Sequence, residues 1–165
     1  MEASDIYRWL MEGGERAACE AFDAHVVASV LAMAVIEGQR EGRQVAECLG
    51  LEGAALVAWV EDAFPHAVST FARLAGGALA PADEHEQRLR ALLRRFAAHG
   101  AFAERLADVV ARRCLRPDAL WRELGLRNPR EVSWLMERHF ESLAQRNARA
   151  TDWKAFLDGA SRPNS

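Results

Sequence analysis

The residues of this chain best suited to bind a metal are three cysteines and five histidines. The cysteines are far apart and form no CxxC pair, and no two histidines have HExxH spacing. Reduced cysteines that pack as small apolar residues are the favoured interpretation. His139 is predicted to lie on an apolar helix face, where it is either a metal ligand or a residue at the edge of the core. The sequence therefore assigns no metal site, and the candidates that it leaves are His139, Cys114 and Cys48.

A second group of residues is suited to an oxyanion or an acidic partner, which guanidinium groups and helix N-termini bind together. Residues 88–149 carry 14 arginines and seven acidic residues, whereas residues 1–87 carry five arginines and 15 acidic residues. Such asymmetry favours either a basic face for an acidic partner or two halves that attract each other. Solvated helix faces, and a structural ion pair for Arg113, are the alternative. The candidate partner- or anion-binding residues are Arg112, Arg113, Arg116, Trp121, Arg146, Asn147, Trp153 and Lys154.

Catalytic arrangements are missing from the sequence. No serine stands in a Gly-x-Ser-x-Gly setting, and neither a P-loop nor a dinucleotide-binding fingerprint occurs. Adjacent acids such as Glu61 and Asp62 have the character of solvated residues. We therefore predict that the chain is not an enzyme.

The elements that position these residues are predicted to be helices. Alanine, leucine, arginine and glutamate dominate, and β-branched residues are few. A length of 165 residues suits one domain with a sizeable core. We predict an all-α fold, a single-domain bundle of about eight mostly short helices over residues 1–160, followed by a frayed tail at 161–165.

Two helix starts are well marked. Asn128 and Pro129 supply a cap and a first helical residue, with Glu131 in the first turn, and the apolar stripe that follows extends to Leu143. Asp83 with Glu86 resembles a capping box and starts a helix that extends to about residue 99. The remaining predicted helices cover residues 4–12, 16–36, 43–49, 53–64, 67–74, 101–116 and 120–124.

The helix at 16–36 is apolar nearly all round, which is typical of a central helix. Its most apolar run, residues 26–36, is too short to span a bilayer. The N-terminal residues are acidic and polar and do not resemble a targeting segment. These features predict a cytoplasmic protein without a membrane segment.

A weak internal repeat is present. Leu49-Gly50-Leu51 is followed by Trp59 at the same spacing that separates Leu124-Gly125-Leu126 from Trp134, so two helix-turn-helix units are predicted in pseudo-equivalent positions. A nucleic-acid-binding regulator is therefore an alternative function. The sequence argues against it, because the second helix of the first unit begins Glu52-Gly53-Ala54-Ala55, which repels phosphate and donates nothing to bases.

The order and spacing of several short motifs resemble the NifQ family over most of the chain. The resemblance implies a helical accessory protein of nitrogen fixation that handles molybdenum for assembly of the iron-molybdenum cofactor, with other cofactor-assembly proteins as partners. The motifs are Asp23 to Ala34, Leu49-Gly50-Leu51, Phe64-Pro65, Arg112-Arg113, Leu120-Trp121, Leu124-Gly125-Leu126, Arg138-His139-Phe140, Leu143-Ala144, Arg146-Asn147 and Trp153-Lys154-x-Phe156.

The sequence departs from the family pattern after Phe156. In the family, four cysteines follow at this point and are thought to hold an iron-molybdenum-sulfur cluster, whereas no cysteine follows Cys114 here. Ala155 and Ala119 stand where the family has a lysine and often a histidine. We therefore expect altered or lost cluster binding and action through partner binding, or else a shortened chain. A metal-free protein-interaction module and a homodimer stay open as alternatives.

Overall fold

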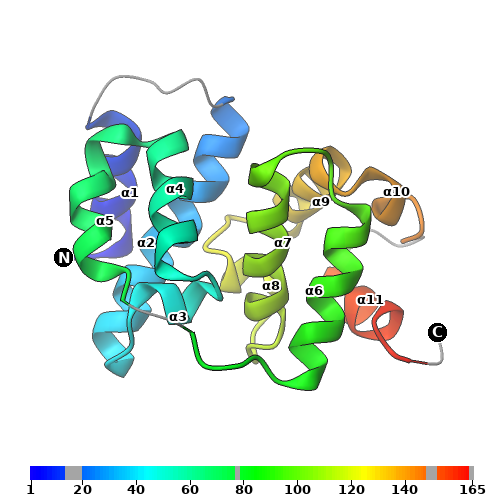
Figure 1. The fold of residues 1–165 in the computed structure, drawn as a ribbon. Helices are drawn as coiled ribbons and strands as arrows, with labels where there is room; N and C mark the ends of the chain where they lie inside the picture. Colours follow the sequence, from blue (N-terminus) through cyan, green and yellow to red (C-terminus); the bar gives the residue numbers. More distant parts are fainter. Residues whose placement is uncertain (14–19, 77–78, 148–151, 164–165) are drawn as a thin grey trace. The chain divides into compact units, whose positions relative to one another are not determined.

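The structure, a computed structural model, describes residues 1–13, 20–76, 79–147 and 152–163, and these residues form helices and the turns between them (Figure 1). The prediction of an all-α fold is confirmed. Eight of the α-helices within the described residues have seven or more residues, which agrees with the number predicted, and the others are single turns. The helices group into two compact units, Met1–Leu79 and Ala80–Ser165.

The first unit is built around one long central helix. Its interior run 26–32 is buried residue by residue, and α1 and α3 pack against it, so the prediction of a central helix is confirmed. The elements of this unit are α1 (Ala3–Glu12), α2 (Ala21–Glu41), α3 (Val45–Leu49), α4 (Gly53–Ala63), the 3-10 turn η1 (Pro65–Ala67) and α5 (Val68–Leu74).

Helix α2 continues five residues beyond the predicted end, through the segment that was expected to be a polar break. Gly38 stays helical because its bare Cα faces the backbone of the next segment, where a Cβ would lie 2.6 Å from the carbonyl oxygen of Arg43. The helix ends instead at Gly42, which has a φ of 68°, and the N–H groups of Gly42 and Arg43 both donate to the Gly38 carbonyl. The predicted start at residue 16 lies outside the described residues.

Gly38→Ala tests this close approach. The added methyl group meets backbone rather than a flexible side chain, so we expect a loss of about 1–2 kcal/mol in the free energy of unfolding, despite the better helix propensity of alanine. Gly159→Ala in α11 is the matched control, because its Cβ would meet open space, and it should stabilise by roughly 0.5–1 kcal/mol. Urea titrations of both variants measure the difference; equal effects would contradict the packing role of Gly38.

By length and composition alone, α2 is also apolar enough to cross a membrane, which corrects the view that its apolar run is too short. Its most apolar window has a mean hydropathy of 1.5, and 67% of that window is buried within the structure. A core helix of a globular unit has the same properties, since it too is surrounded by apolar side chains.

The second unit begins with the helix pair α6 and α7, which pack along each other, and its later helices are short. Both predicted helix starts are confirmed: Asp83 accepts the Glu86 N–H at 2.7 Å, and Asn128 accepts the Glu131 N–H at 3.2 Å. The elements are α6 (Glu84–Phe96), α7 (Ala101–Cys114), α8 (Leu120–Glu123), α9 (Pro129–His139), α10 (Glu141–Ala144) and α11 (Trp153–Ala160).

The prediction of a continuous helix from 129 to 143 is wrong, because the helix is interrupted at Phe140. This residue has a φ of −138° and is completely buried, and the helix resumes only for the single turn α10. The break leaves the carbonyl oxygen of His139 outside the helical ladder, where it accepts the N–H of Ala98 at 2.8 Å. The bend therefore ties the end of α9 to the loop between α6 and α7.

The internal repeat is present as local structure, because α3–α4 and α8–α9 each have a left-handed glycine in the turn, Gly50 with a φ of 70° and Gly125 with a φ of 73°, but it does not extend to burial. Trp59 on α4 is completely buried, whereas Trp134 on α9 is 48% exposed. The two tryptophans therefore do not occupy equivalent environments, although each follows a Leu-Gly-Leu turn at the same distance.

The predicted domain limits stay a prediction, except at the end of the chain. Ser161 was expected in a frayed tail, yet it is buried and its hydroxyl donates to the Asp158 carbonyl at 3.0 Å. The ordered chain therefore continues past residue 160, and residues 164–165 lie outside the described part.

Candidate partner-binding site

The first turn of α11 is the element around which a candidate site forms. Asp152 caps the helix by accepting the Ala155 N–H at 3.0 Å. Trp153, which is 3% exposed, donates its indole N–H to the hydroxyl of Ser133 on α9 at 2.9 Å. These two hydrogen bonds fix the next residue, Lys154, on the side of α11 that faces the end of α7.

Lys154 is the sole lysine of the chain. Its ammonium group donates to the backbone carbonyls of Arg116 and Asp118, the latter at 3.0 Å. These carbonyls follow the C-terminus of α7, where the helix dipole favours a cation. Lys154 therefore joins α11 to the loop between α7 and α8, and cavities open on both sides of it. We call the two together the Lys154 cleft.

The first cavity of the cleft has a volume of about 360 Å³ and is mainly aromatic and aliphatic. Trp121 is half-buried, and the guanidinium of Arg122 lies 4.9 Å from its ring centre. Such a cavity is large enough for one side chain of a partner protein. Its lining residues are Pro117, Asp118, Ala119, Leu120, Trp121, Pro129, Val132, Asp152, Trp153 and Lys154.

The second cavity has a volume of about 480 Å³, and ionisable side chains make up a larger share of its lining residues. His85 on α6 and Asp158 on α11 both line it, with the His85 Nε2 atom 2.9 Å from the Asp158 carboxylate. Cys114 also lines it but is 3% exposed. Burial raises the pKa of the Cys114 thiol to about 11, against a smaller lowering by Lys154, so the thiol is protonated at neutral pH.

Because the pKa of the Cys114 thiol is raised, the free energy of unfolding of the second unit should decrease at alkaline pH. The folded state retains a proton that the unfolded chain loses above about pH 9, so stability is unaffected below pH 9 and falls as pH rises toward 11. We expect a loss of about 2–3 kcal/mol over this range. The Cys114→Ala variant should lack this component, and urea titrations of both proteins at pH 8 and pH 10.5 measure about two thirds of it. Equal pH dependence of the two proteins would contradict the assignment.

Three of the four arginines predicted to bind a partner or an anion have partners within their own unit. Arg113 is 1% exposed and donates to the backbone carbonyl of Glu123 at 2.8 Å and to its carboxylate at 3.2 Å. Arg116 lies 3.9 Å from the same carboxylate, and Arg112 pairs with Glu86. The structural ion pair expected for Arg113 is thus present, and its acidic partner is Glu123.

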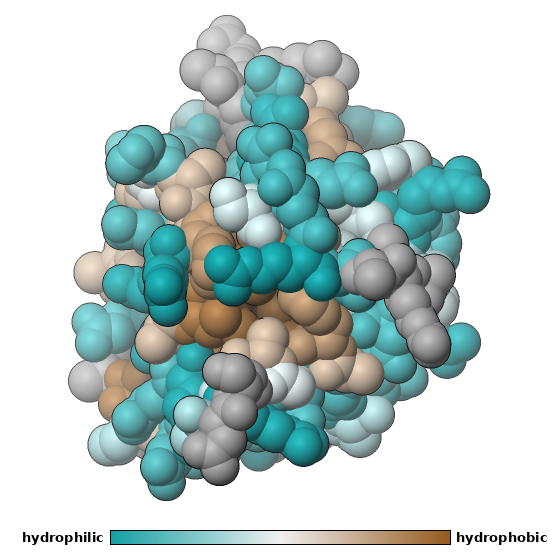
Figure 2. Space-filling view, turned by 90° about the vertical axis from the view of Figure 1, so that its right-hand side faces the viewer, coloured by the Kyte–Doolittle hydropathy of each residue, from teal (hydrophilic) through white to brown (hydrophobic). Residues whose placement is uncertain are grey.

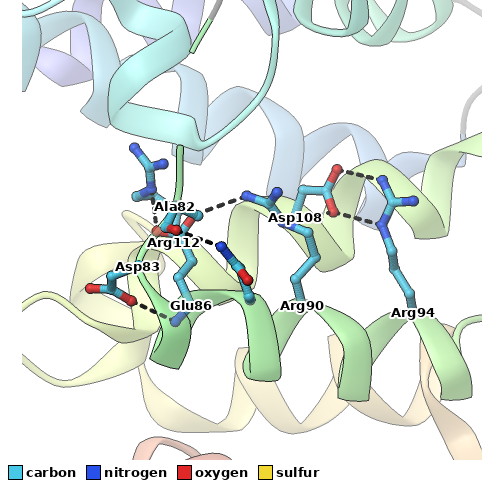
Figure 3. A network of polar contacts seen from close by, with 8 residues as sticks. Ala82, Asp83, Glu86, Arg90, Arg94, Asp108 and Arg112 are labelled. Carbon is cyan, nitrogen blue, oxygen red and sulfur yellow. Dashed lines mark hydrogen bonds and ion pairs between the residues drawn. The ribbon is translucent and has the colours of Figure 1, made fainter. Parts of the chain in front are cut away.

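Figure 3 shows that Arg112 is one end of a longer network along α6 and α7. Glu86, which is almost fully buried, also pairs with Arg90 at 2.8 Å. Arg94 donates two hydrogen bonds of 2.7 and 2.8 Å to the carboxylate of Asp108. These bonds raise the pKa of Arg94 above its ordinary value. Much of the arginine excess of this half is therefore used to hold α6 and α7 together rather than displayed to a partner.

The remaining predicted residue of the arginine group, Arg146, lies elsewhere in the unit. Its guanidinium is 4.6 Å from the ring centre of Phe96 at the end of α6, a cation–π contact. Asn147, the next residue, is half-buried. Figure 2, which faces the side of α10 and α11, shows an apolar area crossed by hydrophilic side chains. The guanidinium of Arg146 therefore covers the ring of Phe96.

The three metal-ligand candidates are divided between the two units. Cys48 belongs to the first unit, and Cys114 to the second. His139 lies in the second unit against the Phe102 ring, with 5.0 Å between ring centres. Among the described residues, no group of three or more histidine, cysteine or acidic side chains is arranged to hold a metal ion.

Of the predicted partner-binding residues, the structure gathers Trp121, Trp153 and Lys154 in the Lys154 cleft, with Arg116 contributing a backbone carbonyl. Sequence reasoning missed Asp118, Asp152 and His85. Asp152 was detectable, because an acid directly before a Trp-x-x-Phe run is a helix cap. Nothing local indicates His85, since its partner Asp158 is 73 positions away.

Known proteins of one family are similar to this chain. A model of the NifQ family matches residues 26–158, which end within α11. The NifQ homolog of Sinorhizobium fredii (strain NBRC 101917 / NGR234) is 36% identical over 137 residues, which are 82% of this chain and 60% of that protein. The NifQ protein of Azotobacter vinelandii is 40% identical over 52 residues, 32% of this chain and 27% of that protein. The chain thus spans about 60% of the length of the first relative, and no solved structure gives a significant match.

Proposed function

Since this chain belongs to the NifQ family, we propose that it is a non-enzymatic accessory protein of nitrogen fixation that handles molybdenum for assembly of the iron-molybdenum cofactor. The observation that carries the proposal is the family match over residues 26–158, which includes most of both units and the Lys154 cleft. Molybdenum is here the cargo and not a resident cofactor.

We further propose that residues 1–165 act by binding partner proteins, with cofactor-assembly proteins as the class of partner. The Lys154 cleft supports this, because it is concave, has aromatic and proline walls and lies beside exposed carboxylates. Aromatic side chains in such pockets are the usual anchors of protein interfaces. Of the two tryptophans that line the first cavity, Trp121 is the one available to a partner, since Trp153 is buried.

Altered or lost cluster binding by these residues is the third part of the proposal. Iron–sulfur clusters are held by thiolates. The Cys114 thiol is buried with a raised pKa, and Cys48 is buried in the other unit, so neither is a ready thiolate donor. Anaerobic reconstitution with iron, sulfide and molybdate, followed by elemental analysis, tests this part. Near-stoichiometric iron in the purified chain would overturn it.

The cellular role is tested by complementation. A nitrogen-fixing bacterium that lacks its own NifQ is supplied with this chain, and nitrogenase activity is measured at limiting molybdate. The proposal predicts recovery with the unmodified chain and a reduced recovery with Trp121→Ala, which leaves the buried tryptophans in place. No recovery, in a strain that a relative restores, would overturn the proposal. We place this role in the cytoplasm, because α2 is largely buried within its unit.

A further inference from the structure

The charged side chains that line the Lys154 cleft are mostly acidic. Asp118 and Asp152 line the first cavity, and Asp152 and Asp158 line the second. Lys154 lines both cavities, and among the described lining residues no arginine accompanies it. His85 adds an imidazole to the second cavity. The walls of the cleft thus carry three carboxylates and one ammonium group.

The ammonium group of Lys154 is engaged by the backbone. It donates to the carbonyls of Arg116 and Asp118, which follow the C-terminus of α7, where the helix dipole favours a positive charge. Part of its charge is therefore offset by these carbonyl groups. The aspartates of the cleft are neutralised less by Lys154 than they would be in direct ion pairs.

Three arginines lie near the cleft without lining it. The guanidinium of Arg122 is stacked on an aromatic ring of the first cavity, and that of Arg116 lies 3.9 Å from a carboxylate of α8. Arg162 pairs with Asp158 at 3.0 Å, and its side chain is 70% exposed. An ion pair this exposed contributes little, so the guanidinium of a partner can replace Arg162 at the same carboxylate.

The aspartates of the first cavity can accept further hydrogen bonds. Asp118 and Asp152 are both exposed, and one oxygen of each accepts a backbone N–H, from Ala119 at 3.1 Å and from Ala155 at 3.0 Å. A carboxylate has about four acceptor sites. A single backbone N–H therefore leaves room on each aspartate for a guanidinium or an ammonium group.

The uncharged walls of the first cavity suit the rest of a basic side chain. Lysine and arginine bury an aliphatic stem along apolar surface and keep the charge at its end. Pro117, Trp121 and Pro129 offer such a surface, and the face of an indole also attracts a cation. A cavity that combines these walls with carboxylates favours a basic side chain over an acidic one.

We propose that the Lys154 cleft recognises a basic segment of its partner protein, with an arginine or lysine stem against Trp121 and its charge beside Asp118 and Asp152. This polarity is the opposite of the one suggested by the arginine excess of residues 88–149. Charges more than about 8 Å away are largely screened at physiological ionic strength, so the residues that line the cleft decide. The inference rests on the proposed function for the presence of a partner at the cleft.

Peptide binding to the full chain tests the charge preference. The probe is a blocked eight-residue peptide of glycine and serine with two leucines and two arginines, and matched peptides carry citrulline or glutamate in place of arginine. The indole N–H signal of Trp121 in nitrogen-15 spectra reports binding at the cleft. We expect the arginine peptide to bind with a dissociation constant of about 1 mM or below, and both other peptides at least about tenfold more weakly. No binding of the arginine peptide, or equal binding of either matched peptide, overturns the proposal.

Variants of the same shape make the test specific. The double variant Asp118→Asn with Asp152→Asn keeps an acceptor for each backbone N–H, and it should bind the arginine peptide about tenfold more weakly and the citrulline peptide unchanged. Asp83→Asn alters an exposed capping aspartate that lines neither cavity, so it is the matched control and should bind as the unmodified chain does. Undiminished binding by the double variant would contradict the proposed role of the two aspartates.

Complementation separates this inference from the proposed function. Suppose that the unmodified chain restores nitrogenase activity and Trp121→Ala lowers it, but the double aspartate variant is fully active. The cleft then binds a partner that is not basic, and only this inference is overturned. If instead the chain restores no activity yet binds the arginine peptide through both aspartates, the charge preference is supported and the proposed function is overturned.

Discussion

Glu123→Ala is expected to lower the free energy of unfolding of the second unit by about 3 kcal/mol. The carboxylate of Glu123 is the charged partner of Arg113, which is 1% exposed, and it also accepts the Asp118 N–H at 2.9 Å. Removing it takes away the carboxylate that lies 3.2 Å from the buried Arg113 guanidinium. The remaining bond from Arg113 to the Glu123 backbone carbonyl keeps the expected loss at the lower end of the range for a broken buried pair.

Urea titration followed by circular dichroism measures this loss, and hydrogen exchange assigns it to the second unit. The double variant Arg113→Met with Glu123→Met removes both charges and should recover more than half of it, because no buried charge is then unpaired. Glu84→Ala is the matched control: its carboxylate is 88% exposed and pairs with Arg88 at 3.4 Å on the helix surface, so stability should hardly change. An equally small effect of Glu123→Ala would show that the pair does not hold the loop.

The parts of the fold that were predictable from sequence are those fixed within a few residues. The capping side chains of Asp83 and Asn128 accept the N–H groups of the residues three positions later. Gly125 adopts a φ of 73° at the turn that the sequence predicts after residue 124. The buried stripe of α9 follows from its 3.6-residue period. Such features depend on local chemistry and not on what packs against the helix.

The errors occur where a distant segment decides. The helical conformation of Gly38 depends on the approach of the chain at Arg43 after a left-handed turn, and the break at Phe140 is accompanied by a bond from Ala98 to the preceding carbonyl. The exposure of Trp134 could not be inferred from its similarity to Trp59, because the two helix-turn-helix units pack against different neighbours.

The candidate site was predictable in its residue types but not in its contacts. Trp121, Trp153 and Lys154 were identified from motifs, whereas the groups that they meet come from far along the chain: Ser133 is 20 positions from Trp153, and the Arg116 carbonyl is 38 positions from Lys154. The roles of the arginines changed for the same reason. Charge counts along the sequence do not tell which guanidinium groups are already paired with buried acids such as Glu86 and Asp108.

The second large effect is expected at Trp153, which holds α11 in place. Its side chain is 3% exposed, packs edge-on against Phe156 with 5.7 Å between ring centres, and donates to Ser133. Trp153→Ala removes this apolar contact and leaves a cavity, so we expect a loss of about 3–4 kcal/mol. Hydrogen exchange of α11 and urea titration of the chain measure the local and the global part.

Two controls divide this effect into its causes. Ser133→Ala removes the acceptor of the Trp153 indole N–H and should cost about 1 kcal/mol, and Trp134→Ala, at a position 48% exposed, should cost little. If α11 is held mainly by Trp153, then Trp153→Ala should also release Lys154 from the carbonyls of Arg116 and Asp118. Both cavities of the cleft should then be lost, because Lys154 lines each of them. In that case Trp153→Ala must reduce complementation at least as much as Trp121→Ala does. Retained activity with a released α11 would mean that partners bind elsewhere than the Lys154 cleft.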